Sequence, residues 1–242
     1  MISDSFNIDC MEYMAGLPDR AFNLALCDPP YFSGPEKRGY YGNAVSPIGV
    51  KRKDYAIGRK WQVPDESWYR EIRRISEHQI IFGINYFGFS DAPAGRIVWD
   101  KCNGSSSFSD CEIASCSLIS SVRLFRYMWN GMCQGKLSEE GSVMQGNKAL
   151  NEKRIHPTQK PIALYMWLLK KFAEGGWRIF DPFLGSGSSR IAAYRLGLDF
   201  VGCESDEEYF NAEEERFREE KMQGLLFTPE ELSLLDTEKK TI

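Results

Sequence analysis

Several features are scarce in this sequence of 242 residues. No run of about 18 apolar residues occurs, so no segment is predicted to span a membrane. The seven cysteines are scattered without a Cys-x-x-Cys pair, and the chain has only two histidines, which argues against a zinc site. The first residues lack the basic and apolar regions of an export signal, so we expect a cytoplasmic protein with reduced thiols and no metal.

The acidic balance of the chain is unevenly distributed. The formal net charge is -4, yet residues 34–74 hold ten Lys or Arg against five Asp or Glu. From Asp199 onward the chain holds fourteen acidic and five basic residues. This asymmetry is typical of a protein with one face toward DNA and a solvated back face, although such charge runs also occur on ordinary soluble surfaces.

Short apolar segments alternate with helical patterns along the chain. Strands are predicted at 22–26, 79–82, 96–99, 111–119, 177–180 and 200–203, and helices at 65–77, 161–173, 187–196 and 207–222. This alternation predicts an α/β fold with a doubly wound, mostly parallel sheet. The stretches 33–60 and 120–154 lack clear periodicity, and we interpret them as a basic loop and a target-recognition insertion in a domain of residues 1–222. Residues 223–242 form a predicted C-terminal tail.

A glycine-rich turn follows the strand predicted at 177–180, in the segment Asp181-Pro182-Phe183-Leu184-Gly185-Ser186-Gly187. Gly185 and Gly187 permit a tight turn that opens a helix, and Glu204 ends the next strand, seventeen residues beyond Gly187. An acid at this distance holds ribose hydroxyls in dinucleotide-binding folds. The pattern therefore favours a cofactor that contains adenosine, with tight packing as the simpler alternative. No Gly-Lys-Ser/Thr follows, which disfavours a nucleoside triphosphatase.

The segment Asp28-Pro29-Pro30-Tyr31 ends the strand predicted at 22–26. Ligands bind at the carboxyl ends of strands in open α/β sheets. The carboxylate of Asp28 and the carbonyl of Pro29 could together accept the N–H groups of a conjugated amine and so activate its nitrogen. Pro30 stiffens the turn, and Tyr31 could stack on a base. The alternative is a proline-rich turn whose tyrosine packs on the core.

A third segment, His156-Pro157-Thr158-Gln159-Lys160-Pro161, leads into the helix predicted at 161–173. Thr158 can cap that helix, and Thr158 with Lys160 could hold a carboxylate. Without its neighbours, this segment would indicate only a loop histidine and a solvated lysine.

The three segments together resemble the β-group of bacterial and phage DNA amino-methyltransferases. In that group the catalytic tetrapeptide comes first, the His-Pro-Thr segment second and the cofactor loop last, which is the order of Asp28, His156 and Asp181 here. The resemblance covers about residues 5–222 and implies a Rossmann-like methyltransferase fold with a permuted motif order. No Pro-Cys dipeptide occurs, so attack by a cysteine on cytosine C5 is not expected.

The resemblance implies S-adenosylmethionine as cofactor and a target base flipped out of double-stranded DNA. The catalytic residues would be Asp28, Pro29, Pro30 and Tyr31. The cofactor-binding residues would be Asp9, Asp28, His156, Thr158, Lys160, Asp181, Phe183, Gly185, Ser186, Gly187 and Glu204. Asp9 lacks the glycine that usually precedes it in the family. The segments Trp99-Asp100-Lys101 and Phe108-Ser109-Asp110, and Glu112, resemble weaker central motifs whose roles stay open.

In this family an aspartate at the first catalytic position favours adenine N6, and a serine favours cytosine N4. Asp28 therefore predicts adenine, with cytosine N4 and a catalytically silent DNA-binding protein as alternatives. Lys37, Arg38, Lys51, Arg52 and Lys53 are expected to contact phosphates, and Arg123 and Arg126 to contact base edges. A homodimer and a role in restriction–modification are further expectations.

Overall fold

The computed structural model describes residues 1–31, 63–103, 109–130, 133–138 and 141–226. Several predictions therefore lie outside the described residues. These are the phosphate contacts of Lys37, Arg38, Lys51, Arg52 and Lys53, the basic loop 33–60, Phe108 and most of the C-terminal tail.

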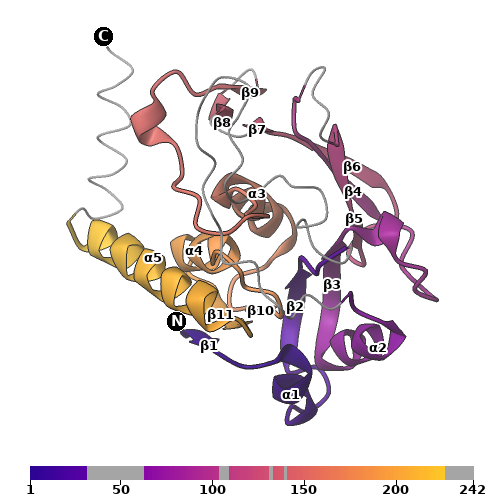
Figure 1. Ribbon diagram of the computed structural model, residues 1–242. Helices are drawn as coiled ribbons and strands as arrows, with labels where there is room; N and C mark the ends of the chain where they lie inside the picture. Colours follow the sequence, from indigo (N-terminus) through magenta and orange to yellow (C-terminus); the bar gives the residue numbers. More distant parts are fainter. Residues whose placement is uncertain (32–62, 104–108, 131–132, 139–140, 227–242) are drawn as a thin grey trace.

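An eight-stranded sheet forms the centre of the protein (Figure 1), in the order β1-β11-β10-β2-β3-β5-β4-β6. Its strands are β1 (Ser3–Phe6), β2 (Phe22–Cys27), β3 (Ser76–Phe82), β4 (Arg96–Asp100), β5 (Cys111–Cys116), β6 (Val122–Arg126), β10 (Arg178–Asp181) and β11 (Asp199–Cys203). Only β5 is antiparallel to its neighbours in this sheet. The prediction of a mostly parallel sheet is confirmed.

Helices cover both faces of the sheet (Figure 1), which confirms the doubly wound arrangement. On one face lie α1 (Cys10–Ala15) and α2 (Glu66–Ile75), whose apolar side chains pack on Phe22, Ile81 and Phe180. On the other face lie α3 (Ile162–Phe172), α4 (Ser188–Arg195) and α5 (Glu207–Leu226), which pack on Leu24, Ile80 and Phe200 among others. The described residues therefore form two hydrophobic clusters, one on each side of the sheet.

Local sequence explains why α2 begins where it does. The side chain of Asp65 accepts hydrogen bonds from the backbone N–H groups of Ser67 and Trp68, which makes it the N-cap of the helix. Trp68, Ile72 and Ile75 then recur at helical spacing and are buried against the sheet. Capping and apolar spacing indicate the same helix, so its prediction from sequence succeeds.

The stretch 120–154 is more regular than predicted. Residues 122–126 form β6 and pair with β4 in the main sheet, so the prediction of an irregular segment is wrong there. β6 is an edge strand whose Val122 and Leu124 are exposed. It therefore lacks the buried apolar run by which the other strands were predicted. A small sheet of β7 (Trp129–Asn130), β8 (Cys133–Ser138) and β9 (Gly141–Met144) follows, and then the 3-10 helix η3 (Lys148–Leu150).

The small sheet is joined to the segment that precedes α3. The indole N–H of Trp129 donates to the backbone carbonyl of Gln159 at 2.7 Å, and Gln134 exchanges two hydrogen bonds with the backbone of Glu152.

None of the helices in the described residues is long and apolar enough to cross a membrane.

Candidate active site at the carboxyl edge of the sheet

One edge of the main sheet collects nearly all of the predicted site residues. The parallel strands end at this edge, and the antiparallel strand β5 begins there. The chain turns in opposite directions after β2 and after β10, which are neighbours in the sheet. Such a switch point is where open α/β sheets bind ligands. Asp28 follows β2 and Asp181 ends β10, so the two motifs lie on either side of the switch point.

The glycine-rich turn connects β10 to α4. Gly185 and Gly187 have positive φ values of 53° and 70°, which favour glycine. Asp181 is buried and accepts hydrogen bonds from the backbone N–H of Phe183 and the hydroxyl of Ser189. Burial raises the pKa of Asp181 to about 7. Ser186 is buried too, with its hydroxyl 3.2 Å from that of Ser188, and both are part of the turn's internal support.

Glu204 and Asp9 lie next to this turn. The carboxylate of Glu204 accepts a hydrogen bond from the backbone N–H of Gly185 at 2.9 Å. Its backbone carbonyl accepts one from the N–H of Ile8 at 3.1 Å, which brings the segment after β1 alongside. Asp9 is exposed and caps α1 through the N–H of Met11, and Phe183 packs on Trp68 with ring centroids 5.5 Å apart. Two acidic residues and an aromatic ring around a glycine-rich turn fit a cofactor that contains adenosine.

The tetrapeptide 28–31 forms a second centre across the switch point. The hydroxyl of Tyr31 donates to Oδ1 of Asp28 at 2.7 Å. Pro29 is buried and Pro30 is half-buried, so the turn is fixed in the fold. Burial raises the pKa of Asp28, while the neighbouring charge of Lys160 opposes that rise.

The ring of Tyr31 contacts two residues, Gly83 and Tyr86, that sequence reasoning missed. Gly83 follows β3 with a φ of +69°, and a Cβ atom there would lie 2.1 Å from the Tyr31 ring. Tyr86 stacks on the Tyr31 ring, with ring centroids 5.3 Å apart and planes inclined by 9°. A glycine directly after a buried strand was the available signal, but many glycines occur at such positions for reasons of turn geometry alone.

The segment 156–160 reaches both centres. The ring of His156 lies 3.6 Å from the position that a Cβ on Gly185 would take, and it meets Tyr209 edge-on. Burial lowers the pKa of His156 to about 3, and Lys160 adds to the effect. Lys160 has a side chain only 3% exposed and forms an ion pair with Oδ1 of Asp28. One short segment therefore contacts the glycine turn at one end and the carboxylate of Asp28 at the other.

The prediction that Thr158 caps the following helix is wrong. Pro161 occupies the N-cap position of α3 without a side-chain hydrogen bond, and Thr158 is too far from the helix start to replace it. The hydroxyl of Thr158 instead lies 3.2 Å from Nδ1 of His156. Thr158 is exposed, so it stays available to a ligand at this edge.

The two arginines predicted to contact bases are placed differently on β6. Arg126 lies opposite Asp100 at the site edge, and its guanidinium pairs with that carboxylate at 3.1 Å. Arg123 lies opposite Ile97, three residues further from the edge, and points to the opposite face of the strand. Both side chains are exposed.

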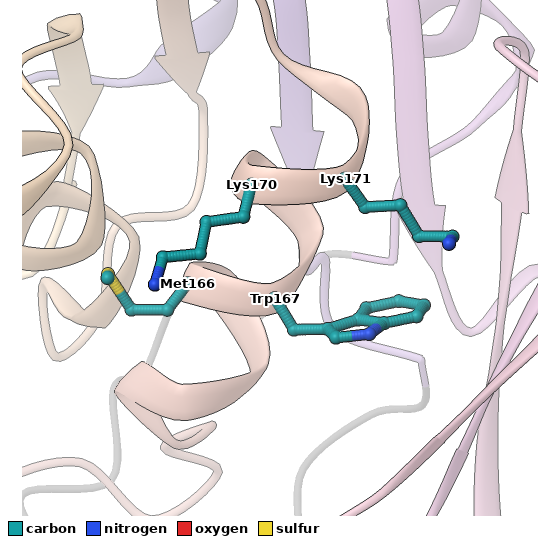
Figure 2. A pocket seen from close by; sticks show the side chains of 4 residues that line it. All are labelled: Met166, Trp167, Lys170 and Lys171. Atoms are coloured by element: carbon teal, nitrogen blue, oxygen red, sulfur yellow. The ribbon is translucent and has the colours of Figure 1, made fainter.

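An open hollow of about 400 Å³ lies along α3 (Figure 2), lined by Met166, Trp167, Lys170 and Lys171. These residues belong to the C-terminal half of the helix, whereas Lys160 precedes its N-terminus. At a rise of about 1.5 Å per residue the hollow lies roughly 10 Å or more along the helix from Lys160. It is therefore separate from the site at the sheet edge.

The fold is that of Rossmann-like methyltransferases, and comparisons with known proteins find similarity to DNA methyltransferases. A family model described as DNA methylase matches residues 123–215. The chain is 25% identical, over 96% of its own length and 71% of the relative's, to the type II methyltransferase M.HinfI of Haemophilus influenzae.

Solved structures with the same fold include the M1.HpyAVI–SAM complex, with a TM-score of 0.52, 20% identity and coverage of 89% of this chain and 100% of that chain. They also include the cytosine-N4-specific PvuII DNA methyltransferase, with a TM-score of 0.52, 16% identity and coverage of 90% and 86%. The chain is thus similar in sequence and in fold to DNA methyltransferases.

Proposed function

We propose that this DNA amino-methyltransferase transfers the methyl group of S-adenosylmethionine to the exocyclic N6 of adenine in double-stranded DNA. The observation that carries the proposal is the half-buried carboxylate of Asp28, held at the switch point of the sheet beside Tyr31 and Lys160. Asp28, in the family pattern, favours adenine over cytosine.

S-adenosylmethionine supplies a methyl group on a positively charged sulfur. The turn with Asp181, Phe183, Gly185, Ser186 and Gly187 would hold its adenosine part, with Glu204 at the ribose and Asp9 at the base. His156 lies beside Gly185, and the hydroxyl of Thr158 lies 3.2 Å from Nδ1 of His156, so both could contact the cofactor. Lys160 pairs with Asp28, so we assign it to the catalytic centre as well as to the cofactor's neighbourhood.

The residues of the tetrapeptide then act on the target base. Asp28 and the carbonyl of Pro29 accept the two N–H groups of the amine, which draws its lone pair out of conjugation and toward the methyl carbon. Tyr31 supports the flipped ring by stacking. Its hydroxyl now donates to the oxygen of Asp28 that also binds Lys160, so base entry must replace or rearrange this hydrogen bond.

DNA would approach the same edge. Arg126 is held there by Asp100 and is better placed to contact base edges than Arg123. Lys37, Arg38, Lys51, Arg52 and Lys53 are proposed to contact phosphates. Methylation of cytosine N4 is the second candidate function, because it needs the same activation of an exocyclic amine. Cytoplasmic location, a homodimer and a role in restriction–modification stay predictions.

Two variants with separate readouts test the proposal. Asp28→Ala should abolish methyl transfer to DNA while cofactor affinity, measured by calorimetry, falls only modestly. Glu204→Ala should instead weaken cofactor binding, because it removes charge-assisted hydrogen bonds worth about 1.5–3 kcal/mol. Turnover of Asp28→Ala within about tenfold of wild type, a barrier change of only about 1.4 kcal/mol, would contradict the role of Asp28.

The modified base is identified by hydrolysis of the methylated DNA and mass spectrometry of its nucleosides. N6-methyladenine supports the proposal and N4-methylcytosine supports the second candidate. Wild-type protein that binds DNA and cofactor but forms neither product would support the silent DNA-binding alternative.

A further inference from the structure

Four charged side chains of alternating sign form a row at the catalytic edge. Lys101, directly after β4, pairs with Oε1 of Glu112 on β5. Oε2 of Glu112 lies 2.9 Å from Nζ of Lys160, and Lys160 pairs in turn with Asp28. The exposed fractions of the side chains of Lys101, Glu112, Lys160 and Asp28 are 17%, 19%, 3% and 15%, so the row is largely removed from water.

The row holds two positive and two negative groups, so it is neutral as a whole. Neutrality matters because an unbalanced charge in a partly buried site is strongly unfavourable. Aromatic rings enclose Lys160, whose Nζ lies 4.8 Å from the ring centre of Phe82 and 5.4 Å from that of Tyr31. Lys160 alone could neutralise Asp28. Glu112 and Lys101 are thus a second, additional ion pair in contact with the first.

The proposed reaction moves a positive charge to the place where this row ends. The lone pair of the amine nitrogen forms the new N–C bond while the C–S bond breaks, and the electrons of the C–S bond stay on sulfur. The positive charge passes from sulfur to nitrogen, and a proton then leaves the nitrogen for the carboxylate of Asp28 and from there for water. Each step depends on the electrostatic potential at Asp28.

We propose that Glu112 and Lys101 are positioning residues that keep the surroundings of Asp28 electrically neutral, so that Asp28 can accept amine hydrogens beside an ionised Lys160. This inference rests on the proposed function. Without the negative charge of Glu112, both lysines would remain and would oppose the positive charge that develops on the amine. Without Lys101, the opposite imbalance would arise.

The pKa directions agree with this geometry. Burial disfavours the ionised form of Glu112, but the charges of Lys160 and Lys101 outweigh it and lower the pKa to about 2. Burial likewise disfavours ionised Lys160, and the two carboxylates outweigh it and raise the pKa of the lysine. For Asp28, burial raises the pKa, Lys160 opposes the rise and Glu112 adds to it. The other ionisable groups that face Asp28 are Cys27, Tyr31, Tyr165 on α3 and Asp181 on β10.

Three variants separate charge balance from simple structural support. Glu112→Gln leaves the row with a net charge of about +1, Lys101→Met leaves about −1, and the double variant restores zero. The first measurement needs neither cofactor nor DNA: titration of the Asp28 carboxyl by carbon-13 NMR, assigned with Asp28→Asn. We expect the pKa of Asp28 to fall by about 1–3 units in Glu112→Gln and to rise in Lys101→Met. In the double variant it should return toward the wild-type value.

The second measurement is the single-turnover rate of methyl transfer as a function of pH. Its acidic limb should move in the same directions as the pKa of Asp28, and the double variant should be faster than Glu112→Gln. A residue with only a structural role predicts the opposite order, because the second substitution would add further damage. An unchanged Asp28 titration in both single variants, or a double variant slower than both, overturns the inference.

The outcomes also distinguish this inference from the proposed function. If wild-type protein methylates DNA and the two single variants keep its rate and pH profile, charge balance fails while the function stands. If wild-type protein forms no methylated base, the function fails, and the NMR titration still decides the electrostatic claim. Should Glu112→Gln unfold, Lys101→Met alone still tests the inference, through the expected rise in the pKa of Asp28.

Discussion

Replacement of Gly187 by alanine should destabilise the protein much more than the same change at Gly197. Both glycines have nearly the same positive φ, 70° and 68°. A Cβ on Gly187 would lie 2.5 Å from Cγ and Oε1 of Glu213, whereas a Cβ on Gly197 would have no heavy atom within 4 Å. Gly197→Ala therefore measures backbone strain alone, about 1–2 kcal/mol.

Gly187→Ala adds a steric clash with Glu213 to the same backbone strain. Glu213 is fully buried and pairs with Arg190 at 3.0 Å, so it can yield only by disturbing that ion pair. Loss of a buried ion pair costs about 3–5 kcal/mol, and partial displacement should cost about 2–4 kcal/mol beyond the strain. Urea unfolding of the three proteins, with equal m values, gives the free energies of unfolding. If Gly187→Ala and Gly197→Ala lower the free energy of unfolding by amounts that agree within about 0.5 kcal/mol, the contact with Glu213 does not contribute to the cost.

Two further predictions concern pH and DNA. The pKa of His156 is lowered to about 3 from an ordinary 6.5, so below pH 6.5 the unfolded chain binds a proton that the folded chain does not. The stability of the folded state should therefore fall as the pH drops from about 6.5 toward 3. The variant His156→Gln should flatten this pH dependence, while the matched control His78→Gln should leave it in place. Equal slopes for the two variants in thermal melts across this pH range would refute the prediction. For DNA, Lys51, Arg52 and Lys53 replaced together by alanine should weaken binding to all sequences and reduce the salt slope, whereas Arg126→Ala should lower discrimination between target and non-target DNA by about 1–3 kcal/mol. Binding titrations over a salt series test both, and an unchanged slope in the triple variant would leave the basic loop without a role.

The core of the fold was predictable because its strands are short apolar runs next to capped, amphipathic helices. Phe22–Cys27 and Asp199–Cys203 are buried along nearly their whole length, and both predictions were close to the observed bounds. The edge strand β6 was missed because Val122 and Leu124 face solvent, so no buried pattern marks it. Propensity alone does not identify a strand whose pairing is decided by a distant neighbour.

Placement of the main motifs was predictable for a topological reason. Parallel strands end at one edge, so residues that follow β1, β2, β10 and β11 had to meet there. The contact of Lys160 with Glu112 was not predictable in the same way. It depends on β5 running antiparallel, which brings the first residues of that strand to the edge where the others end. Strand direction is set by long-range pairing and is not encoded in a local pattern.

The pairing of β1 with β11 has a consequence for how the protein is made. Ser3 lies beside Phe200 and Phe6 beside Cys203, so the acid Asp9 reaches Glu204 only after nearly two hundred residues have closed into a loop. Closing so long a loop slows folding, because the conformational entropy of the loop is lost before the compensating contacts form. On the ribosome, the N-terminal strand must wait without its partner until β11 has emerged. The part of the site that is proposed to hold adenosine is therefore the late-assembling part of the molecule, and Asp28, which follows β2, can be in place before that part has formed.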